Sequence, residues 1–466
     1  MIRFLEKLNA FVWGMPALVM ILCVGLCLTI KTRGAQFRLF YGALGGLLRP
    51  LLGKTDDVDT KKQRALCTAL AATVGTGNLA GVAGAIALGG PGAVFWMWLC
   101  AFLGMATKMA EATLAVQYRR RDKSGVYGGP MYMILDTMKP RWHWLAYAYC
   151  FLGLVASFGV GNATQVNTVI SSLDATLSGF ALHPGGIIHL LVGIVFAVII
   201  FRVLSGGADS IGRAAERLIP AASVLYVLLA LIGILMRWRT VPGAFVSIFQ
   251  GAFTPSAVTG GAVGSIFISL RVGASRGVFT NEAGMGTAAM AHATADVREP
   301  VEQGLMGIIE VFIDTIVICT ATALVILCSG IEIPYGTDVG IALTANAFAS
   351  IFGNWVGIYI SVALCLFAFA TILGWGLYGM QCARFIFGSG SKKIFVVLQT
   401  GMVVIGALFP THILWLTAEI VNGLMAIPNL MVMFLLIPEV ASLIRAYEKR
   451  HLRKQVPGGY SVGKIV

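Results

Sequence analysis

Apolar segments long enough to cross a bilayer recur from one end of the chain to the other, beginning with residues 11–30. Hydrophobic residues make up 58% of the 466 residues and charged residues only 12%, against about 25% charged in soluble domains. In hydrocarbon, backbone polar groups must bond within the protein, which runs of about 20 apolar residues achieve as α-helices. The sequence therefore predicts an all-α, polytopic membrane protein.

One apolar stretch, Ala71–Gly92, is interrupted in its middle by Gly75, Thr76, Gly77 and Asn78. A glycine weakens a helix by roughly 1 kcal/mol, and a broken backbone survives in a membrane only where it is buried or lines a cavity. A half-helix starting near Asn78 would direct free N–H groups toward an anion, and the carbonyls before it could hold a cation. This design is typical of secondary transporters. Close helix packing through small residues is the structural alternative.

A second glycine-interrupted segment, Gly260–Ala295, lies in the other half of the chain. Paired interrupted helices in two halves are the best sequence pointer to a binding site between inverted repeats. The two halves share hydropathy and glycine placement but no visible residue-level repeat.

The net charge of +13 is distributed as in a membrane protein and argues against a nucleic-acid partner. Basic residues gather in Lys31–Arg64, Arg119–Arg141, Arg202–Arg217, Arg384–Lys393 and Arg445–Lys464. The connections around 171–190, 329–354 and 409–413 have no Lys or Arg. Alternating basic and non-basic loops predict an external N-terminus and a cytoplasmic C-terminus.

That orientation requires an odd number of crossings, and we expect about eleven transmembrane helices. Residues 411–443 then cross once despite an expected break at 426–429. The predicted organisation is an N-terminal helix with a basic connection (1–64), two five-helix repeats (65–236 and 237–446) and a basic cytoplasmic tail (447–466).

Enzyme signatures are missing from the sequence, which has no HExxH, GxSxG or P-loop pattern. The string GTGNLAG has the wrong final interval for a dinucleotide loop and no βαβ context. Nine cysteines form no CxxC pair and read as small packing residues. We therefore expect neither an enzyme nor an organic cofactor.

Several polar residues lie within apolar runs, where they are costly unless paired or facing a cavity. Gln165 could present a donor and an acceptor to a zwitterion or bond a neighbouring helix. Asn281 and Glu282 are expected to serve as a gate or a structural pair with Arg271 or Arg276 at the cytoplasmic mouth. Asp314 could support a cation path, relay a proton or cap a broken helix.

Two further pairs complete the candidates. A Thr371 hydroxyl suits sodium, which takes oxygen ligands, and Trp375 could wall a pocket or serve as packing. Lys108 and Glu111 are expected to form an ion pair or to snorkel at the membrane interface.

The strings GTGNLAGVAGAI, GGPGAVFWMW, GMATKMAE, NEAGMGTAAMAHA, VFIDTIVICT, FAFATILGW and MAIPNL together resemble the alanine/glycine:cation symporter family, from about Arg64 to Leu430. The resemblance implies a LeuT-type fold of two inverted five-helix repeats with interrupted helices, plus one extra N-terminal helix. It also implies sodium-coupled symport of alanine or glycine by alternating access.

The resemblance assigns roles to positions of this sequence. The implied substrate-binding residues are Thr76, Gly77, Gln165 and Trp375. The implied sodium ligands are the carbonyls of Ala71 and Val74 and the hydroxyl of Thr371. A possible second cation site comprises Thr73 and Asn78.

Proton coupling through Asp314 or Glu282 on the same scaffold is the alternative function, and a channel or sensor is a more distant one. The expected partners are alanine or glycine, Na+ and lipid. The expected location is the cytoplasmic (inner) membrane of a bacterium or archaeon.

Overall fold

The computed structural model describes residues 2–48, 57–122, 125–178, 185–337, 340–409 and 412–454. The chain opens with α1 (Ile2–Val12), α2 (Met15–Lys31), α3 (Ala35–Arg38) and α4 (Phe40–Leu48). There follow α5 (Asp57–Thr73), η2 (Gly77–Gly81), α6 (Val82–Gly89), α7 (Ala93–Gln117), β1 (Arg120–Asp122), β2 (Gly125–Tyr127), α8 (Pro130–Thr137), η3 (Pro140–Trp142), α9 (Trp144–Phe158), η4 (Gly159–Ala163), α10 (Thr164–Ser178), α11 (Gly186–Ser205) and α12 (Gly207–Met236).

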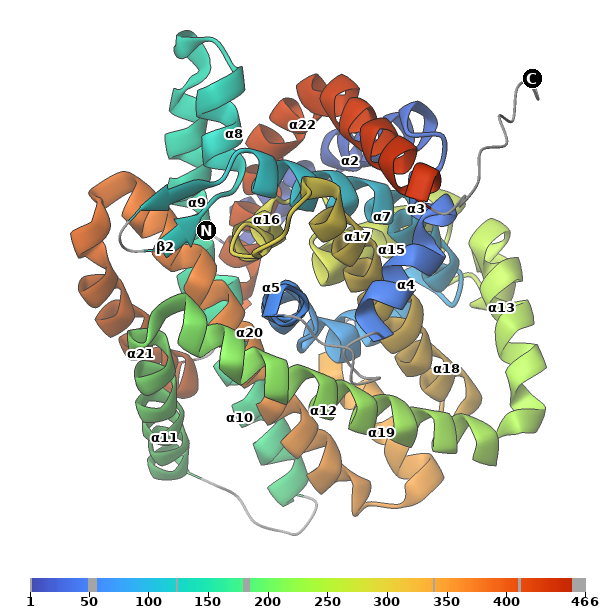
Figure 1. Ribbon diagram of the computed structural model, residues 1–466. Helices are drawn as coiled ribbons and strands as arrows, with labels where there is room; N and C mark the ends of the chain where they lie inside the picture. The colour runs from blue at the N-terminus through green and yellow to red at the C-terminus, as the bar shows by residue number, and fades with distance from the viewer. Residues whose placement is uncertain are drawn as a thin grey trace, which may run out of the picture.

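The second half consists of η5 (Trp238–Thr240), α13 (Val241–Phe253), α14 (Pro255–Val258), α15 (Ile266–Asn281), α16 (Thr287–His292), α17 (Pro300–Val311), η6 (Phe312–Cys319), α18 (Thr320–Cys328), α19 (Gly340–Phe352), α20 (Val356–Phe387), η7 (Ser389–Ser391), α21 (Lys392–Leu408) and α22 (His412–Lys454). Figure 1 shows these helices gathered around α5 and α16, which adjoin the two helix breaks. Within the described residues, the fold is all-α apart from one antiparallel hairpin, in which Arg121 faces Val126.

By length and apolar composition, nine helical segments within the described ranges could cross a membrane, and α5 with α6 forms a tenth that is bent by 52° at its break. The described residues thus give nine or ten candidate crossings, and the expected number of eleven stays a prediction. The bend between α5 and α6 confirms the glycine-based prediction of a broken helix at residues 75–78.

The expected break at 426–429 is wrong. α22 runs unbroken from His412 to Lys454 with Pro428 and Pro438 inside it. An interior proline removes one backbone hydrogen bond and bends a helix, but neighbouring helices can support the helix on both sides. The helix also runs through the predicted boundary at residue 447, and the tail beyond residue 454 lies outside the described residues.

Two groups of helices enclose the interrupted segments. α7 packs against α17, α15 and α16, while α20 packs against α9, α10, α12 and α5. The N-terminal helices α1 and α2 lie against α22, and α2 also contacts α7. One continuous apolar core runs through these contacts, so both breaks are held by helices from distant parts of the chain.

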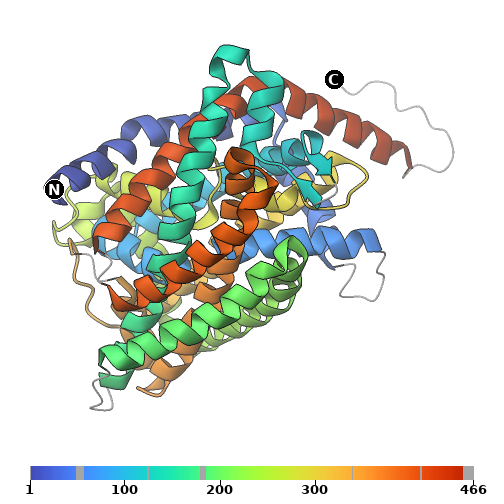
Figure 2. The ribbon, with the colours of Figure 1, turned by 90° about the vertical axis from the view of Figure 1, so that its left-hand side faces the viewer.

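The five basic clusters of the sequence meet on one side of the molecule, which we call the basic face. Arg38 pairs with Glu448, and Lys61 and Arg121 both approach Asp296. The side-chain nitrogen of Lys392 lies against Gly207, and Arg384 pairs with Asp122 of the hairpin. Figure 2 shows the N-terminus at the opposite end of the molecule from the start of α5. This gathering is the pattern that the charge distribution predicts for a cytoplasmic face.

Candidate functional site

The first helix break lies between α5 and η2, where Asn78 replaces the normal backbone bonding. The Gly75 N–H donates to the Asn78 side-chain oxygen (2.8 Å), and the Asn78 N–H donates to the Gly75 carbonyl (3.3 Å). In a continuous helix these N–H groups would bond the carbonyls of Ala71 and Val74. Both predicted sodium-binding carbonyls therefore lose their usual helical partners.

The backbone N–H group of Thr76 is also available at this break. Within the described part of the chain, it has no hydrogen-bond acceptor. Buried N–H groups without an acceptor are rare in proteins. A free donor just before a helix start suits the binding of a carboxylate.

The predicted substrate residues Thr76 and Gln165 meet at the break. The Thr76 hydroxyl donates to the Gln165 side-chain oxygen (3.0 Å), and the Gln165 amide donates to the Val160 carbonyl (2.9 Å). Val160 belongs to η4, a π-turn that interrupts the span formed by α9 and α10. Gln165 is therefore held in place next to the broken helix.

The Thr371 hydroxyl of α20 faces the same break from the other side. A Cβ atom added to Gly75 would lie only 2.6 Å from the Thr371 Oγ1. Thr371 is 2% exposed, and its hydroxyl has no hydrogen-bond partner among the described residues. A buried, unpaired oxygen at this break matches the oxygen ligands that sodium prefers.

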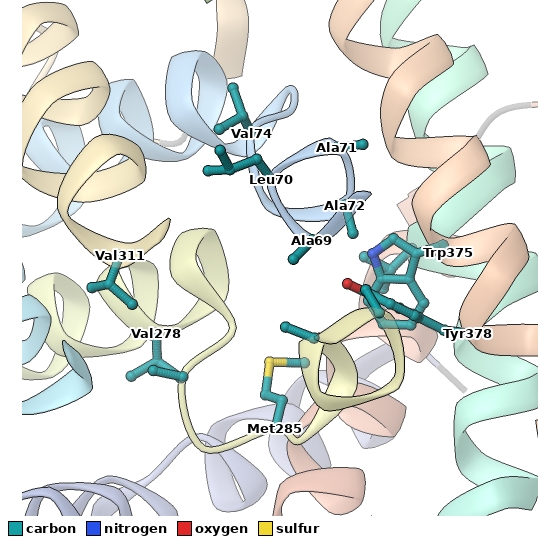
Figure 3. Packing of buried hydrophobic residues seen from close by; sticks show 14 of the residues in the cluster. Ala69, Leu70, Ala71, Ala72, Val74, Val278, Met285, Val311, Trp375 and Tyr378 are labelled. Carbon is teal, nitrogen blue, oxygen red and sulfur yellow. The ribbon is translucent and has the colours of Figure 1, made fainter. Parts of the chain in front are cut away.

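Trp375 lies one helical turn beyond Thr371 and walls this region (Figure 3). The ring packs directly on the Gly161 backbone, because a Cβ added there would come within 2.3 Å of Trp375. Tyr378 lies against the indole at a ring distance of 5.7 Å. Trp375 is 1% exposed, so it is a buried wall and not an interface anchor.

Asp314 fastens the first break to the second. The Asn78 amide donates to an Asp314 carboxylate oxygen (2.7 Å), and Thr315 donates to the other (2.8 Å). The Asn281 amide in turn donates to the Thr315 hydroxyl (3.1 Å). Among the roles left open for Asp314, this geometry favours support of a broken helix.

The residues of the possible second cation site are engaged in other bonds. Thr73 donates back to the Ala69 carbonyl (3.3 Å) within its own helix. The Asn78 side chain bonds both Gly75 and Asp314. A cation there would have to compete with these hydrogen bonds.

The second break, residues 281–286 between α15 and α16, is closed by two side chains that the sequence did not single out for this role. One Glu111 oxygen accepts the Gly284 and Gly286 N–H groups, each at 3.0 Å. Asn429 donates to that same oxygen (2.7 Å) and to the Gly284 carbonyl (2.8 Å). Positive φ angles of 92° and 75° explain why both positions are glycine.

The expected pairing of Glu282 with Arg271 or Arg276 is wrong. Glu282 accepts the Thr287 hydroxyl (2.5 Å) inside the molecule, whereas Arg276 pairs with Glu419 of α22 (3.1 Å). That second pair lies on the face carrying α1, opposite the basic face, where Asn9 also donates to Glu419 (2.7 Å). Glu282 follows Arg276 by six positions along the chain, which is enough to place the two side chains at different depths in the membrane.

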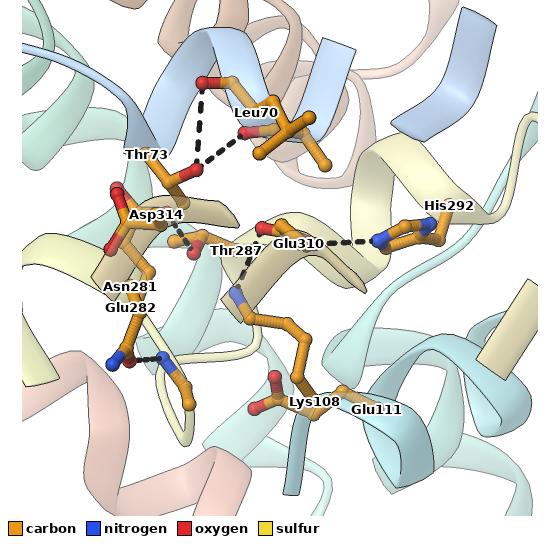
Figure 4. A network of polar contacts seen from close by, with 12 residues as sticks. Leu70, Thr73, Lys108, Glu111, Asn281, Glu282, Thr287, His292, Glu310 and Asp314 are labelled. Atoms are coloured by element: carbon orange, nitrogen blue, oxygen red, sulfur yellow. Dashed lines mark hydrogen bonds and ion pairs between the residues drawn. The ribbon is translucent and has the colours of Figure 1, made fainter. Parts of the chain in front are cut away.

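The interface position expected for Lys108 and Glu111 is also wrong. Both side chains are fully buried, and Lys108 pairs with Glu310 of α17 (3.2 Å). The sequence shows their spacing along α7 but not the buried acid that α17 presents to them. Figure 4 shows this pair together with His292.

Two cavities approach the first break from opposite sides. A cavity of about 250 Å³ is lined by α1, α15 and α22 residues and reaches Phe279, which lies 3.8 Å from a Cβ added to Gly77. A cavity of about 390 Å³ opens on the basic face and is lined by Arg64, Thr68 and Leu377, among others. The break itself is enclosed, since Thr76 and Gln165 are 1% and 4% exposed.

An uncharacterized transporter of Haemophilus influenzae is 42% identical over 434 residues, covering 91% of each chain. The sodium/alanine symporter AgcS of Methanococcus maripaludis is 38% identical over 453 residues, covering 96% of this chain and 97% of the relative.

The fold resembles the crystal structure of MhsT in complex with L-phenylalanine. The TM-score is 0.54 at 14% sequence identity, and the match covers 82% of this chain and 97% of MhsT. The likeness identifies the fold as LeuT-type and confirms that prediction. The profile of the sodium:alanine symporter family matches residues 1–458, and the chain belongs to that family of membrane transporters.

Proposed function

We propose that this protein is a secondary transporter that couples the entry of Na+ to the uptake of a small neutral amino acid, alanine or glycine, at the first helix break. The observation that supports it most is the combination, within the described residues, of the free Thr76 N–H group with the unpaired Thr371 hydroxyl. In this proposal the Thr76 and Gly77 amides hold the substrate carboxylate, and Gln165 and Trp375 complete its pocket. Membership of the family supports cation-coupled amino-acid symport in general.

In this proposal, sodium binds between the carbonyls of Ala71 and Val74 and the Thr371 hydroxyl. These oxygens come from α5 and α20, so the ion joins two helix groups. The amino acid then binds across Gly77. The two cavities on either side of the enclosed site are the approaches that alternating access requires.

We propose that the basic face is cytoplasmic and that the face carrying α1 is external. Moving one positive charge inward then gains about 2.3 kcal/mol per 100 mV. Since about 1.4 kcal/mol is a factor of ten, this sustains roughly 50-fold accumulation before any sodium gradient is added.

Proton coupling is the second candidate function. Asp314 supports it as a buried carboxylate bonded directly to Asn78 at the first break. On this alternative, uptake would proceed without sodium and rise as the external pH falls.

The test is uptake of labelled alanine by the purified protein in liposomes under an imposed sodium gradient, with potassium or choline as the replacement ion. Saturable, concentrative uptake that requires sodium supports the proposal. Uptake that is driven by a proton gradient without sodium would keep the transporter and replace its coupling ion. Absence of alanine and glycine uptake by folded protein would contradict the proposed substrate.

A further inference from the structure

A buried cluster of ionisable groups lies beside the second break, apart from the proposed substrate site. Glu310 of α17 is approached by the Lys108 ammonium (3.2 Å) and by the His292 Nε2 (2.8 Å). All three side chains have no exposed surface. Figure 4 shows them converging from α7, α16 and α17.

Both imidazole nitrogens of His292 have partners. The Gln303 amide nitrogen lies 2.7 Å from Nδ1, so in this arrangement Nδ1 accepts and Nε2 carries the proton given to Glu310. The Gln303 side-chain oxygen has no partner. Rotating this amide by half a turn presents its oxygen to a protonated Nδ1. The site therefore holds either the neutral or the doubly protonated ring without losing a hydrogen bond.

The buried ionisable groups beside His292 include more acids than bases. The carboxyl groups of Glu111, Glu282 and Glu310 surround a single ammonium, that of Lys108, and all are buried. Uncompensated buried charge is costly, and a second cation reduces it. The helices packed on α16 carry further titratable groups, among them Tyr378 and Cys382 on α20, Cys67 on α5 and the Glu282 cap of α15.

The cluster is linked to the second break through Lys108. Lys108 and Glu111 are three residues apart on α7, and helical residues at this spacing lie on one face. The Glu111 oxygen that does not bond the break has no hydrogen-bond partner. A protonated His292 would share Glu310 with Lys108 and would weaken that ion pair. Lys108 could then turn to Glu111, the acid that closes the break.

The cavity on the basic face comes nearer to His292 along the chain than the opposite one does. Thr294 and Asp296, which follow His292 in the chain, line the cavity of about 390 Å³ there. The opposite cavity is lined by residues of α1, α6, α15 and α22.

We propose that His292 is a proton-binding site filled from the basic face, and that the bound proton slows transport by moving Lys108 from Glu310 to Glu111. The second break is then held more firmly while the first remains free to bind substrate. The effect on uptake rests on the proposed function, whereas proton binding by His292 does not.

The transport test varies the pH on the basic face between about pH 5 and about pH 8, the range in which histidine ordinarily titrates. Sodium and the opposite pH are held constant. Wild-type uptake is expected to fall several-fold toward acid pH, and His292→Gln is expected to remove most of this fall. His189→Gln is the matched control, because His189 also bonds a carboxylate, that of Asp174 (2.8 Å), but lies outside the cluster.

A second variant should shift the acid fall in uptake instead of removing it. Gln303→Glu places a carboxylate beside Nδ1 and should move the midpoint of the fall to higher pH by about one unit, the usual scale for a charge at this distance. An unchanged midpoint in folded Gln303→Glu, or an unchanged acid fall in folded, active His292→Gln, would overturn the proposal.

Proton binding itself is read without transport, by NMR of protein labelled with ¹⁵N-histidine. The chain has six histidines, and the signals missing from His292→Gln identify the site. Conversion of these signals between one-proton and two-proton forms across the same pH range is expected. Signals that stay in the one-proton form would contradict the site even if the protein transports alanine.

Discussion

The two helix breaks differ in what their backbone groups bond. At the second break, Glu111 accepts two N–H groups and Asn429 bonds a carbonyl. At the first break, the Thr76 N–H group lacks an acceptor within the described residues. The backbone N–H groups of the interrupted helix thus have acceptors within the protein at the second break, whereas a free donor remains at the first.

This difference indicates that the second break serves the fold and the first break serves transport. A break whose backbone N–H groups are paired gains little from a ligand, whereas a free donor and an unpaired hydroxyl are satisfied only when something binds. Changes at the second break should therefore affect folding first. Changes at the first break should affect transport and leave the fold intact.

The largest effect is expected from Glu111→Leu at the second break. This change leaves the Gly284 and Gly286 N–H groups without their acceptor, removes one of the two acceptors of the Asn429 amide, and unbalances the charge on Lys108. Removing one partner of a buried charged network costs about 3–5 kcal/mol. Thermal unfolding of the purified protein measures the loss. Glu111→Gln, which keeps an acceptor oxygen, should be milder, and a Leu variant as stable as wild type would break the comparison.

Gly77→Leu at the first break should abolish uptake while the protein stays folded. A Cβ at this position makes only ordinary contacts, the nearest being Thr280 at 3.5 Å, but a larger side chain fills the space where substrate is proposed to bind. Labelled alanine uptake should fall at least about tenfold, the equivalent of about 1.4 kcal/mol of lost binding. Gly81→Ala, where a Cβ is 3.9 Å from its nearest neighbour, is the control. Loss of folding in Gly77→Leu would contradict the contrast between the breaks.

Thr371→Val is expected to raise the sodium concentration for half-maximal uptake roughly tenfold, since a lost bond to a charged group costs about 1.5–3 kcal/mol. Stability should change little, because the hydroxyl has no partner to lose. Sodium titration of uptake, with thermal unfolding in parallel, measures both. Thr371→Ser keeps the hydroxyl and should behave as wild type. Equal sodium dependence in the Val and Ser variants would remove Thr371 from the site.

Arg276→Gln tests the half-buried pair that closes the cavity above α15. Losing its bond to Glu419 is expected to cost about 1 kcal/mol or less. Access to this cavity should therefore rise only several-fold. The measurement is labelling of Ser275→Cys, which lines this cavity, by a membrane-impermeant thiol reagent. Faster labelling in the Arg276→Gln background is expected, and an unchanged rate would show that the pair does not control access.

The smallest effect is expected at Lys61–Asp296 on the basic face. The hydrogen bond and the charge of Lys61 hold the pKa of the Asp296 carboxyl below its usual value. Such a group contributes above the unfolded pKa of about 3.9 and loses its contribution as the pH falls through the lowered value. Asp296→Asn should therefore leave the pH profile of uptake between about pH 5 and about pH 8 unchanged. A profile altered as in His292→Gln would place the pH response on this surface pair.

The position of the first break could be predicted from the sequence, because its signals are local. Glycines beside Thr76 and Asn78 in an apolar run imply interruption, and the break occurs there. Thr371 and Trp375 were placed by resemblance to a family, and the structure brings Thr371 to Gly75. The general fold followed from apolar runs and from the alternation of basic loops.

The second break shows what sequence could not reveal. Glu111 and Asn429 are 318 positions apart, and only tertiary packing brings them to Gly284. The polar residue beside Pro428 signals a contact between helices, which sequence alone does not distinguish from a break. Lys108, Glu310 and His292 come from three helices, and no spacing in the chain links them.

The most direct test of the contrast is equilibrium binding of labelled alanine to purified protein in sodium and in potassium. We predict that wild type binds alanine in a sodium-dependent way, that Gly77→Leu does not bind it, and that Thr371→Val needs more sodium to bind it. All three proteins should be equally folded. Tight alanine binding that persists in folded Gly77→Leu would contradict the claim that the open break is the substrate site.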